Sequence, residues 1–171
     1  MAIGQFGPAL ESAMKREGET RKEVGRIAHS DPSMIGKVIK GSRKASEPVM
    51  RAATQHYDDG QLFLAAAGEV TGGAFPPWLN NVDLHRASVL VKSVEELREV
   101  LAASSEAPIS KTGEQITETE RRQIKRLLME TVEAITALTH LAAVLCREYS
   151  FSWLGTWKEH RAELKAKKYV K

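Results

Sequence analysis

The sequence predicts an all-α protein whose N-terminal part is a domain of five short helices. Three observations support this fold class. Residues 6–67 carry short helical patterns separated by capping and turn residues. Residues 124–149 repeat apolar side chains at alternating steps of four and three. Between them, Gly72, Gly73, Pro76 and Pro77 cannot sustain a helix interior or a central strand.

These observations divide the chain into three parts. We expect a domain over residues 1–67, a loop-rich junction with one short helix over 68–116, and a C-terminal helical hairpin over 117–171. The chain of 171 residues, 42% hydrophobic and 27% charged, is long enough for such an arrangement. No internal repeat and no low-complexity tract interrupts it.

Three features of the sequence predict where the protein is located. No continuous apolar run approaches the roughly 20 residues of a membrane-spanning helix, and the first residues lack the pattern of a signal peptide. The single Cys146 cannot form an intramolecular disulfide. We therefore expect a soluble, cytoplasmic protein without a membrane segment.

Positive charge is concentrated in two segments of the chain. Residues 21–51 hold eight Lys and Arg against three Asp and Glu, an excess larger than the net charge of +3 of the whole chain. Residues 158–171 hold six Lys and Arg against two Glu. Such clusters are typical of polyanion binders, although many are only solvated surfaces.

The segment TRKEVGRIAHSDPSMIGKVIKGSRKAS, residues 20–46, predicts two short helices that meet at a sharp angle. The first runs from Arg21 to Ala28, and its Gly25 would allow another helix to approach closely. Asp31 can cap the second helix and Pro32 suits its first position. Gly41 would end that helix.

The remaining helices are predicted from capping boxes and apolar periodicity. Ser93 with Glu96 would open the helix VEELREVLAA, and Thr117 with Glu120 would open the long C-terminal helix. Ser150 to Ser152 would end the long helix, and Trp153 and Trp157 of the next one would share a face. The apolar seam of the long helix, through which we expect a homodimer, is formed by Ile124, Leu128, Ile135, Leu138 and Leu145.

That seam has two other possible uses. It could be covered within the chain by the helix that carries Trp153 and Trp157 and by VEELREVLAA. It could also bind a different protein.

The N-terminal region resembles the Cro/repressor-like helix-turn-helix proteins, the XRE family, over about residues 6–67. Arg21, Val24 and Gly25 match the first helix of the motif, Ile35 and Val38 match the second, and KGSRKAS matches the turn that follows. EPVMRAATQHYDD and FGPALESAMKREGET are similar to the family's fourth and first helices. His29 departs from the pattern, because a turn glycine is usual there, and Ile39 stands where an acidic residue is common.

The resemblance implies binding to double-stranded DNA, with the second helix of the motif in the major groove. Ser33, Met34 and Lys37 would then read base edges. The residues expected near phosphates are Arg21, Lys22, Lys40, Arg43 and Lys44.

No motif for catalysis, cofactor binding or metal binding is evident in the sequence. A phosphate loop, a nucleophile elbow and a paired-carboxylate arrangement are all lacking, and the five histidines do not have the spacing of a metal site. Cys146 is expected in the core rather than as a nucleophile. We predict no cofactor, no metal and no enzyme activity.

The sequence is therefore most consistent with a sequence-specific transcriptional regulator. We expect a repressor of the bacterial or phage type that binds DNA through residues 21–41. The alternative is a helical adaptor that binds another protein and has only non-specific DNA affinity.

Overall fold

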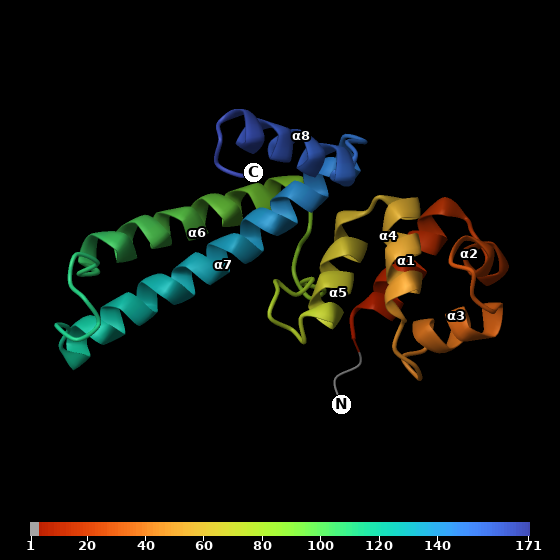
Figure 1. Ribbon diagram of the computed structural model, residues 1–171, viewed down its shortest axis with the longest axis horizontal. Coiled ribbons are helices and arrows are strands. Elements are labelled where there is room, and N and C mark those ends of the chain that lie inside the picture. Colours follow the sequence, from red (N-terminus) through yellow and green to blue (C-terminus); the bar gives the residue numbers. More distant parts are fainter. Residues whose placement is uncertain (1–3) are drawn as a thin grey trace. The chain divides into compact units, whose positions relative to one another are not determined.

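The computed structural model describes residues 4–171, and over these residues the protein is all-α, with eight helices and no strand (Figure 1). The all-α class is thus confirmed. The helices are α1 (Phe6–Glu17), α2 (Arg21–Ile27), α3 (Pro32–Ile39), α4 (Glu47–Tyr57), α5 (Gly60–Val70), α6 (Arg86–Glu106), α7 (Glu118–Glu148) and α8 (Trp153–Ala166).

Contacts between residues divide the chain into two compact units, and the division differs from the expected boundaries. One unit comprises the chain up to Asn80 together with Leu145–Lys171, and the other comprises Asn81–Val144. We expected α7 to form a hairpin with the helix after it. Instead, most of α7 shares a unit with α6, and the Ser93 hydroxyl of α6 donates to the Ala137 carbonyl of α7 at 3.2 Å.

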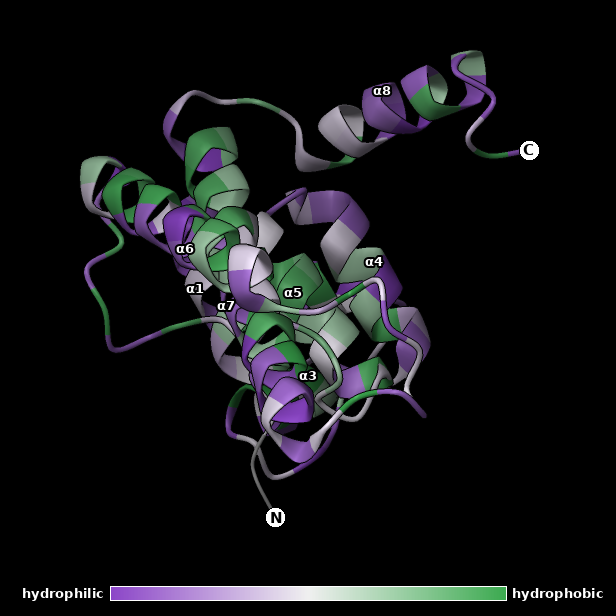
Figure 2. Cartoon of the chain, turned by 90° about the vertical axis from the view of Figure 1, so that its left-hand side faces the viewer, coloured by the Kyte–Doolittle hydropathy of each residue, from purple (hydrophilic) through white to green (hydrophobic). Residues whose placement is uncertain are grey.

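The first unit is built around one apolar core supplied by α1 to α5. Phe6, Leu10, Ile35 and Leu62 are completely buried there. α5 is apolar along most of its length, as its largely green ribbon shows in Figure 2. A Cβ atom at Gly7 would lie 2.3 Å from the carbonyl oxygen of Val38, so glycine is what lets α1 approach the end of α3 so closely.

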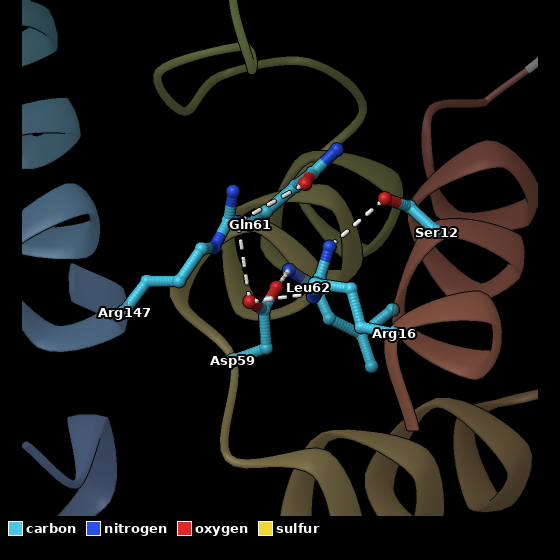
Figure 3. Close-up of polar contacts among 6 residues, drawn as sticks. All are labelled: Ser12, Arg16, Asp59, Gln61, Leu62 and Arg147. Carbon is cyan, nitrogen blue, oxygen red and sulfur yellow. Dashed lines mark hydrogen bonds and ion pairs between the residues drawn. The ribbon is translucent and has the colours of Figure 1, made fainter. Parts of the chain in front are cut away.

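Asp59 forms a polar junction at the start of α5 (Figure 3). Its Oδ1 accepts from the Leu62 amide at 3.0 Å, which caps the helix. Its Oδ2 accepts from Arg16 of α1 at 2.8 Å and from Arg147 of α7 at 3.1 Å. Arg147 also donates to Gln61 and lies over the Trp78 ring. One carboxylate therefore links the helix cap to two distant segments of the chain.

The neighbouring Asp58 holds the start of α8. Its Oδ1 accepts from the Leu154 amide at 2.7 Å, and its Oδ2 accepts from the Ser152 hydroxyl, which itself caps α8. Trp153 is buried and lies beside Phe63, with ring centroids 6.5 Å apart. Trp157 packs edge-on against Trp153 at 5.7 Å, so the predicted shared face of the two tryptophans is confirmed.

In the second unit, the predicted start of the helix at Ser93 is wrong. α6 begins at Arg86, seven residues earlier, and its cap is His85, which accepts from the Ala87 amide at 3.3 Å. Asp83 steadies this start by accepting from the His85 amide and the Ser88 hydroxyl. Ser93 lies inside the helix, where its hydroxyl donates to the Val89 carbonyl.

The predicted start of α7 is confirmed. The Thr117 amide donates to Glu120 Oε2 at 2.8 Å, and the Glu120 amide donates back to Thr117 Oγ1 at 3.3 Å. A hydrogen bond from Lys111 and the cap itself lower the pKa of Glu120 to about 2. By length and composition alone α7 could also cross a membrane, a property that core helices of soluble proteins share.

Both helices of the second unit leave apolar side chains exposed. The seam residues Leu128, Ile135 and Leu138 of α7 are exposed, and Ile124 is half-buried. Leu145, the last residue of the predicted seam, is exposed but belongs to the first unit. α6 exposes a similar row, whose members recur at steps of four and three: Leu90, Val94, Leu97 and Leu101.

Candidate nucleic-acid interface

The candidate interface is formed by α2, α3 and the turn that joins them. α2 begins with a capping box that the sequence analysis missed. The Thr20 amide donates to Glu23 Oε2 at 2.6 Å, and the Glu23 amide donates to Thr20 Oγ1 at 3.4 Å. The signal was the T-x-x-E spacing of Thr20 and Glu23.

The turn between α2 and α3 is tight, because Gly25 has no Cβ atom and lets the backbone of the turn pack against α2. A Cβ atom on Gly25 would lie only 2.6 Å from the Ser30 carbonyl oxygen, so the closest neighbour is the turn itself, and the first residue of α3, Pro32, lies further away at 3.4 Å. His29 occupies the left-handed region with φ of 46°. That conformation explains why a glycine is favoured where His29 stands.

We expect His29→Gly to raise the free energy of unfolding by about 1 kcal/mol, because it removes the strain of a Cβ atom at positive φ. The gain is measured by urea denaturation of the full chain. His29→Ala keeps the Cβ atom and serves as the matched control, so it should give no gain. Equal effects of the two substitutions would contradict the strain argument.

α3 begins as predicted. Asp31 Oδ1 accepts from the Ser33 amide at 2.7 Å, and Pro32 occupies the first turn. Hydrogen bonds from Ser33 lower the pKa of Asp31. At the other end Gly41 has φ of 68°, and the amides of Ser42 and Arg43 both donate to the Lys37 carbonyl. This turn fixes the position of Arg43 relative to Lys37.

The outward side of α3 carries the predicted base readers. Ser33 and Lys37 are exposed and Met34 is half-buried, whereas Ile35 and Val38 are buried on the opposite side. Gly36, which precedes Lys37 on α3, is buried. The side chain of Arg21 covers Gly36. If a Cβ atom were added to Gly36, it would lie 3.5 Å from Arg21 Nη1.

The predicted phosphate contacts surround this surface unevenly. Arg21 lies against α3 at Gly36, and Arg43 Nη1 lies 3.7 Å from the Met34 sulfur. Lys22 and Lys40 are exposed at the start of α2 and the end of α3. Lys44 is exposed too, and it lines a hollow with Gln5, Glu69 and Phe75.

Six cations of this region form no ion pair within residues 4–171, although Asp31 lies near enough to Lys37 to interact with its charge. In the part of the chain from residue 4 onward, no carboxylate pairs with the cations of the candidate interface: Arg21, Lys22, Lys37, Lys40, Arg43 and Lys44. Many other cations are paired, among them Arg16, Arg51, Lys92, Lys111, Arg126 and Arg147. Unpaired cations thus surround α3, and Lys158, Arg161 and Lys165 of α8 form no ion pair with the described residues either.

Comparisons of the chain with protein-family models, with curated proteins and with solved structures gave no match.

Proposed function

We propose that this protein is a sequence-specific DNA-binding transcriptional regulator of the Cro/repressor-like helix-turn-helix type, acting as a repressor. The observation that carries the proposal is the set of unpaired cations around an exposed helix that has its own cap and a tight preceding turn. DNA supplies a dense row of phosphates that would neutralise such charges and release counterions. α2 and α3 are the helix-turn-helix of this proposal.

In this proposal, α3 enters the major groove and its outward side chains read bases. Lys37 can donate to guanine O6 and N7, the Ser33 hydroxyl can donate or accept, and the Met34 side chain can contact a thymine methyl group. Arg43 lies on the Met34 sulfur and would hold that side chain in place.

Phosphate contacts would fix the position of α3 on the duplex. Arg21 lies against the middle of α3, Lys40 and Arg43 lie at its C-terminal end, and Lys22 is exposed at the start of α2, so these cations could contact phosphates bordering the major groove. Lys44 is exposed next to Arg43 in sequence, and we expect it to contribute a salt-screened attraction to phosphate.

We further propose that the protein acts as a homodimer through unit 2. Each helix carries an exposed apolar row, Leu90 to Leu101 on α6 and Leu128 to Leu138 on α7. At 3.6 residues per turn, both rows lie on the same side of the α6–α7 contact. Two such hairpins facing each other would form a four-helix bundle and bury both rows.

Selection of bound sequences from a random DNA pool tests this function. A regulator should enrich one motif, arranged as two half-sites about 34–36 Å apart. It should also prefer that motif over competitor DNA as salt rises, because base contacts depend less on salt than phosphate contacts do. Failure to enrich any motif would contradict the proposal.

The exposed apolar rows also favour a second function, that of a helical adaptor for another protein. Such an adaptor would use the rows of α6 and α7 for a different helical partner, and its basic surface would bind DNA without preference. Measurements in solution distinguish the two functions. An adaptor would be a monomer in isolation, and its affinity for DNA of every sequence would fall equally as the salt concentration rises.

Within the proposed function, Lys37→Ala should reduce binding by about 1–3 kcal/mol at one operator position and flatten the base preference there. The measurement is a competition series in which each base pair of the selected motif is varied in turn. Arg43→Ala is the comparison, because a phosphate contact should weaken all sequences alike and lower the salt slope by about one unit. A uniform loss for Lys37→Ala would make Lys37 a phosphate contact instead.

A further inference from the structure

Four glutamates converge between α6 and α7, well separated in sequence from the candidate DNA interface. Glu96 and Glu99 lie one turn apart on α6, and Glu130 and Glu133 lie one turn apart on α7. One carboxylate oxygen from each lies within 4.8 Å of the others. The sequence analysis found no paired-carboxylate arrangement, and the structure corrects this, because the antiparallel helices bring two E-x-x-E pairs together.

Glu96 carries the strongest sign that this group needs a ligand. Its side chain is buried, with the residue 4% exposed, and its Oε2 has no hydrogen-bond partner. Its other oxygen, Oε1, is held by Lys92 at 2.7 Å. A buried carboxylate oxygen without a partner loses its hydration and gains nothing in return, which is costly unless a cation or donor occupies the place beside it.

The charges around the cluster do not neutralise it. Lys92 pairs with Glu96 and is shared with Glu95, and Arg126 lies 3.6 Å from Glu130 but 3.0 Å from Glu106. Burial and the neighbouring carboxylates Glu96 and Glu130 raise the pKa of Glu99. Two shared cations against four carboxylates leave an excess of negative charge.

We propose that Glu96, Glu99, Glu130 and Glu133 bind one hard divalent cation of the size of Ca²⁺. Carboxylate oxygens are the ligands that such ions prefer. Two oxygens on opposite sides of a Ca²⁺ ion are about 4.6–5.2 Å apart, since each Ca–O distance is about 2.3–2.6 Å. The four oxygens all lie within 4.8 Å of one another, so one Ca²⁺ ion placed among them can reach an oxygen of each glutamate.

A cation at this position would join α6 to α7 through two ligands on each helix. It would relieve the repulsion among the carboxylates and give Glu96 Oε2 the partner that it lacks. The ion would therefore stabilise the hairpin of the second unit. This inference does not depend on DNA binding.

Titration of the EDTA-stripped full chain with Ca²⁺ tests the site. We expect saturable binding of one ion per chain by calorimetry and a higher melting temperature of the protein. Mn²⁺ should bind at the same place, which is followed through the loss of the free-ion signal in electron paramagnetic resonance. Glu96→Gln combined with Glu130→Gln should lower the affinity for both Ca²⁺ and Mn²⁺ by about ten-fold or more.

Glu95→Gln is the matched control, because Glu95 pairs with the same Lys92 but lies outside the cluster. It should bind both ions as the parent protein does. Glu99→Gln checks for unfolding: in EDTA it should melt no lower than the parent, since it removes repulsion, yet it should lose the stabilisation by Ca²⁺. The proposal is overturned by the absence of saturable binding up to about 1 mM, the weak limit of natural calcium modules. It is also overturned if Glu96→Gln with Glu130→Gln binds as Glu95→Gln does.

Discussion

Ile135→Glu together with Leu138→Glu is expected to convert the proposed dimer into a monomer that binds the selected operator at least about 100-fold more weakly. Ile135 is 48% exposed and Leu138 is 38% exposed, so within one chain these side chains tolerate charge. At a dimer interface, the same substitutions would place four carboxylates in an apolar contact and would cost far more than the interface supplies. Sedimentation gives the oligomeric state, and fluorescence anisotropy with the selected operator gives the affinity.

The control for this experiment is Val91→Glu together with Met129→Glu. These side chains are also exposed and lie on the same two helices, but outside the apolar rows. The control adds the same charge to the protein, so it should remain dimeric and keep most of its affinity. A parent protein that sediments as a monomer at micromolar concentration and binds the operator at full strength would refute the dimer.

The second large effect is expected at Asp59. Asp59→Ala removes the cap of α5 and leaves Arg16 and Arg147 without their carboxylate. Loss of a cap costs about 1 kcal/mol. The two ion pairs are only partly buried, and their loss brings the expected total to about 2–4 kcal/mol of the free energy of unfolding. Urea denaturation of the full chain measures it.

Two further variants separate the contributions at Asp59. Asp59→Asn can still cap α5 but carries no charge, so it should cost less than Asp59→Ala. Arg147→Gln removes the ion pair with Asp59 but leaves the cap of α5 and the pair with Arg16 intact, and it should increase hydrogen exchange in α8 more than in α1. If all three variants were as stable as the parent protein, Asp59 would contribute nothing to holding these segments together.

The parts of the fold that were predicted correctly depend on interactions between near neighbours. Asp31 caps the helix that Pro32 begins, Gly41 ends it, and Thr117 and Glu120 cap each other across three residues. Each signal acts through the backbone beside it, so a single sequence contains the whole interaction.

The parts that were not predicted depend on contacts between distant segments. Ser93 and Glu96 have the spacing of a capping box, but both are buried against α7, and this tertiary environment places them inside a helix. The glutamate cluster was missed for the same reason. Its two E-x-x-E pairs are visible in the sequence, but only the alignment of α6 with α7 brings them within reach of each other.

The candidate DNA interface falls between these cases. The exposure of Ser33 and Lys37 follows from the periodicity of α3 and was predicted. The burial of Gly36 was not, because it results from the Arg21 side chain lying across α3. The lack of carboxylate partners for the cations could not be predicted either, since it depends on the whole surrounding surface.

The first unit is discontinuous in sequence, because Leu145–Lys171 belongs with the segment up to Asn80 while the second unit is inserted between them. During translation, the ribosome would therefore synthesise α1 to α5 well before the C-terminal segment. Only later could Trp153 pack beside Phe63 and Arg147 pair with Asp59. At about 5–20 residues per second, that delay lasts from about 5 to 20 seconds. For that interval the nascent chain would expose the apolar surface that the C-terminal segment later covers. Premature termination near residue 80 would therefore release a fragment prone to aggregate.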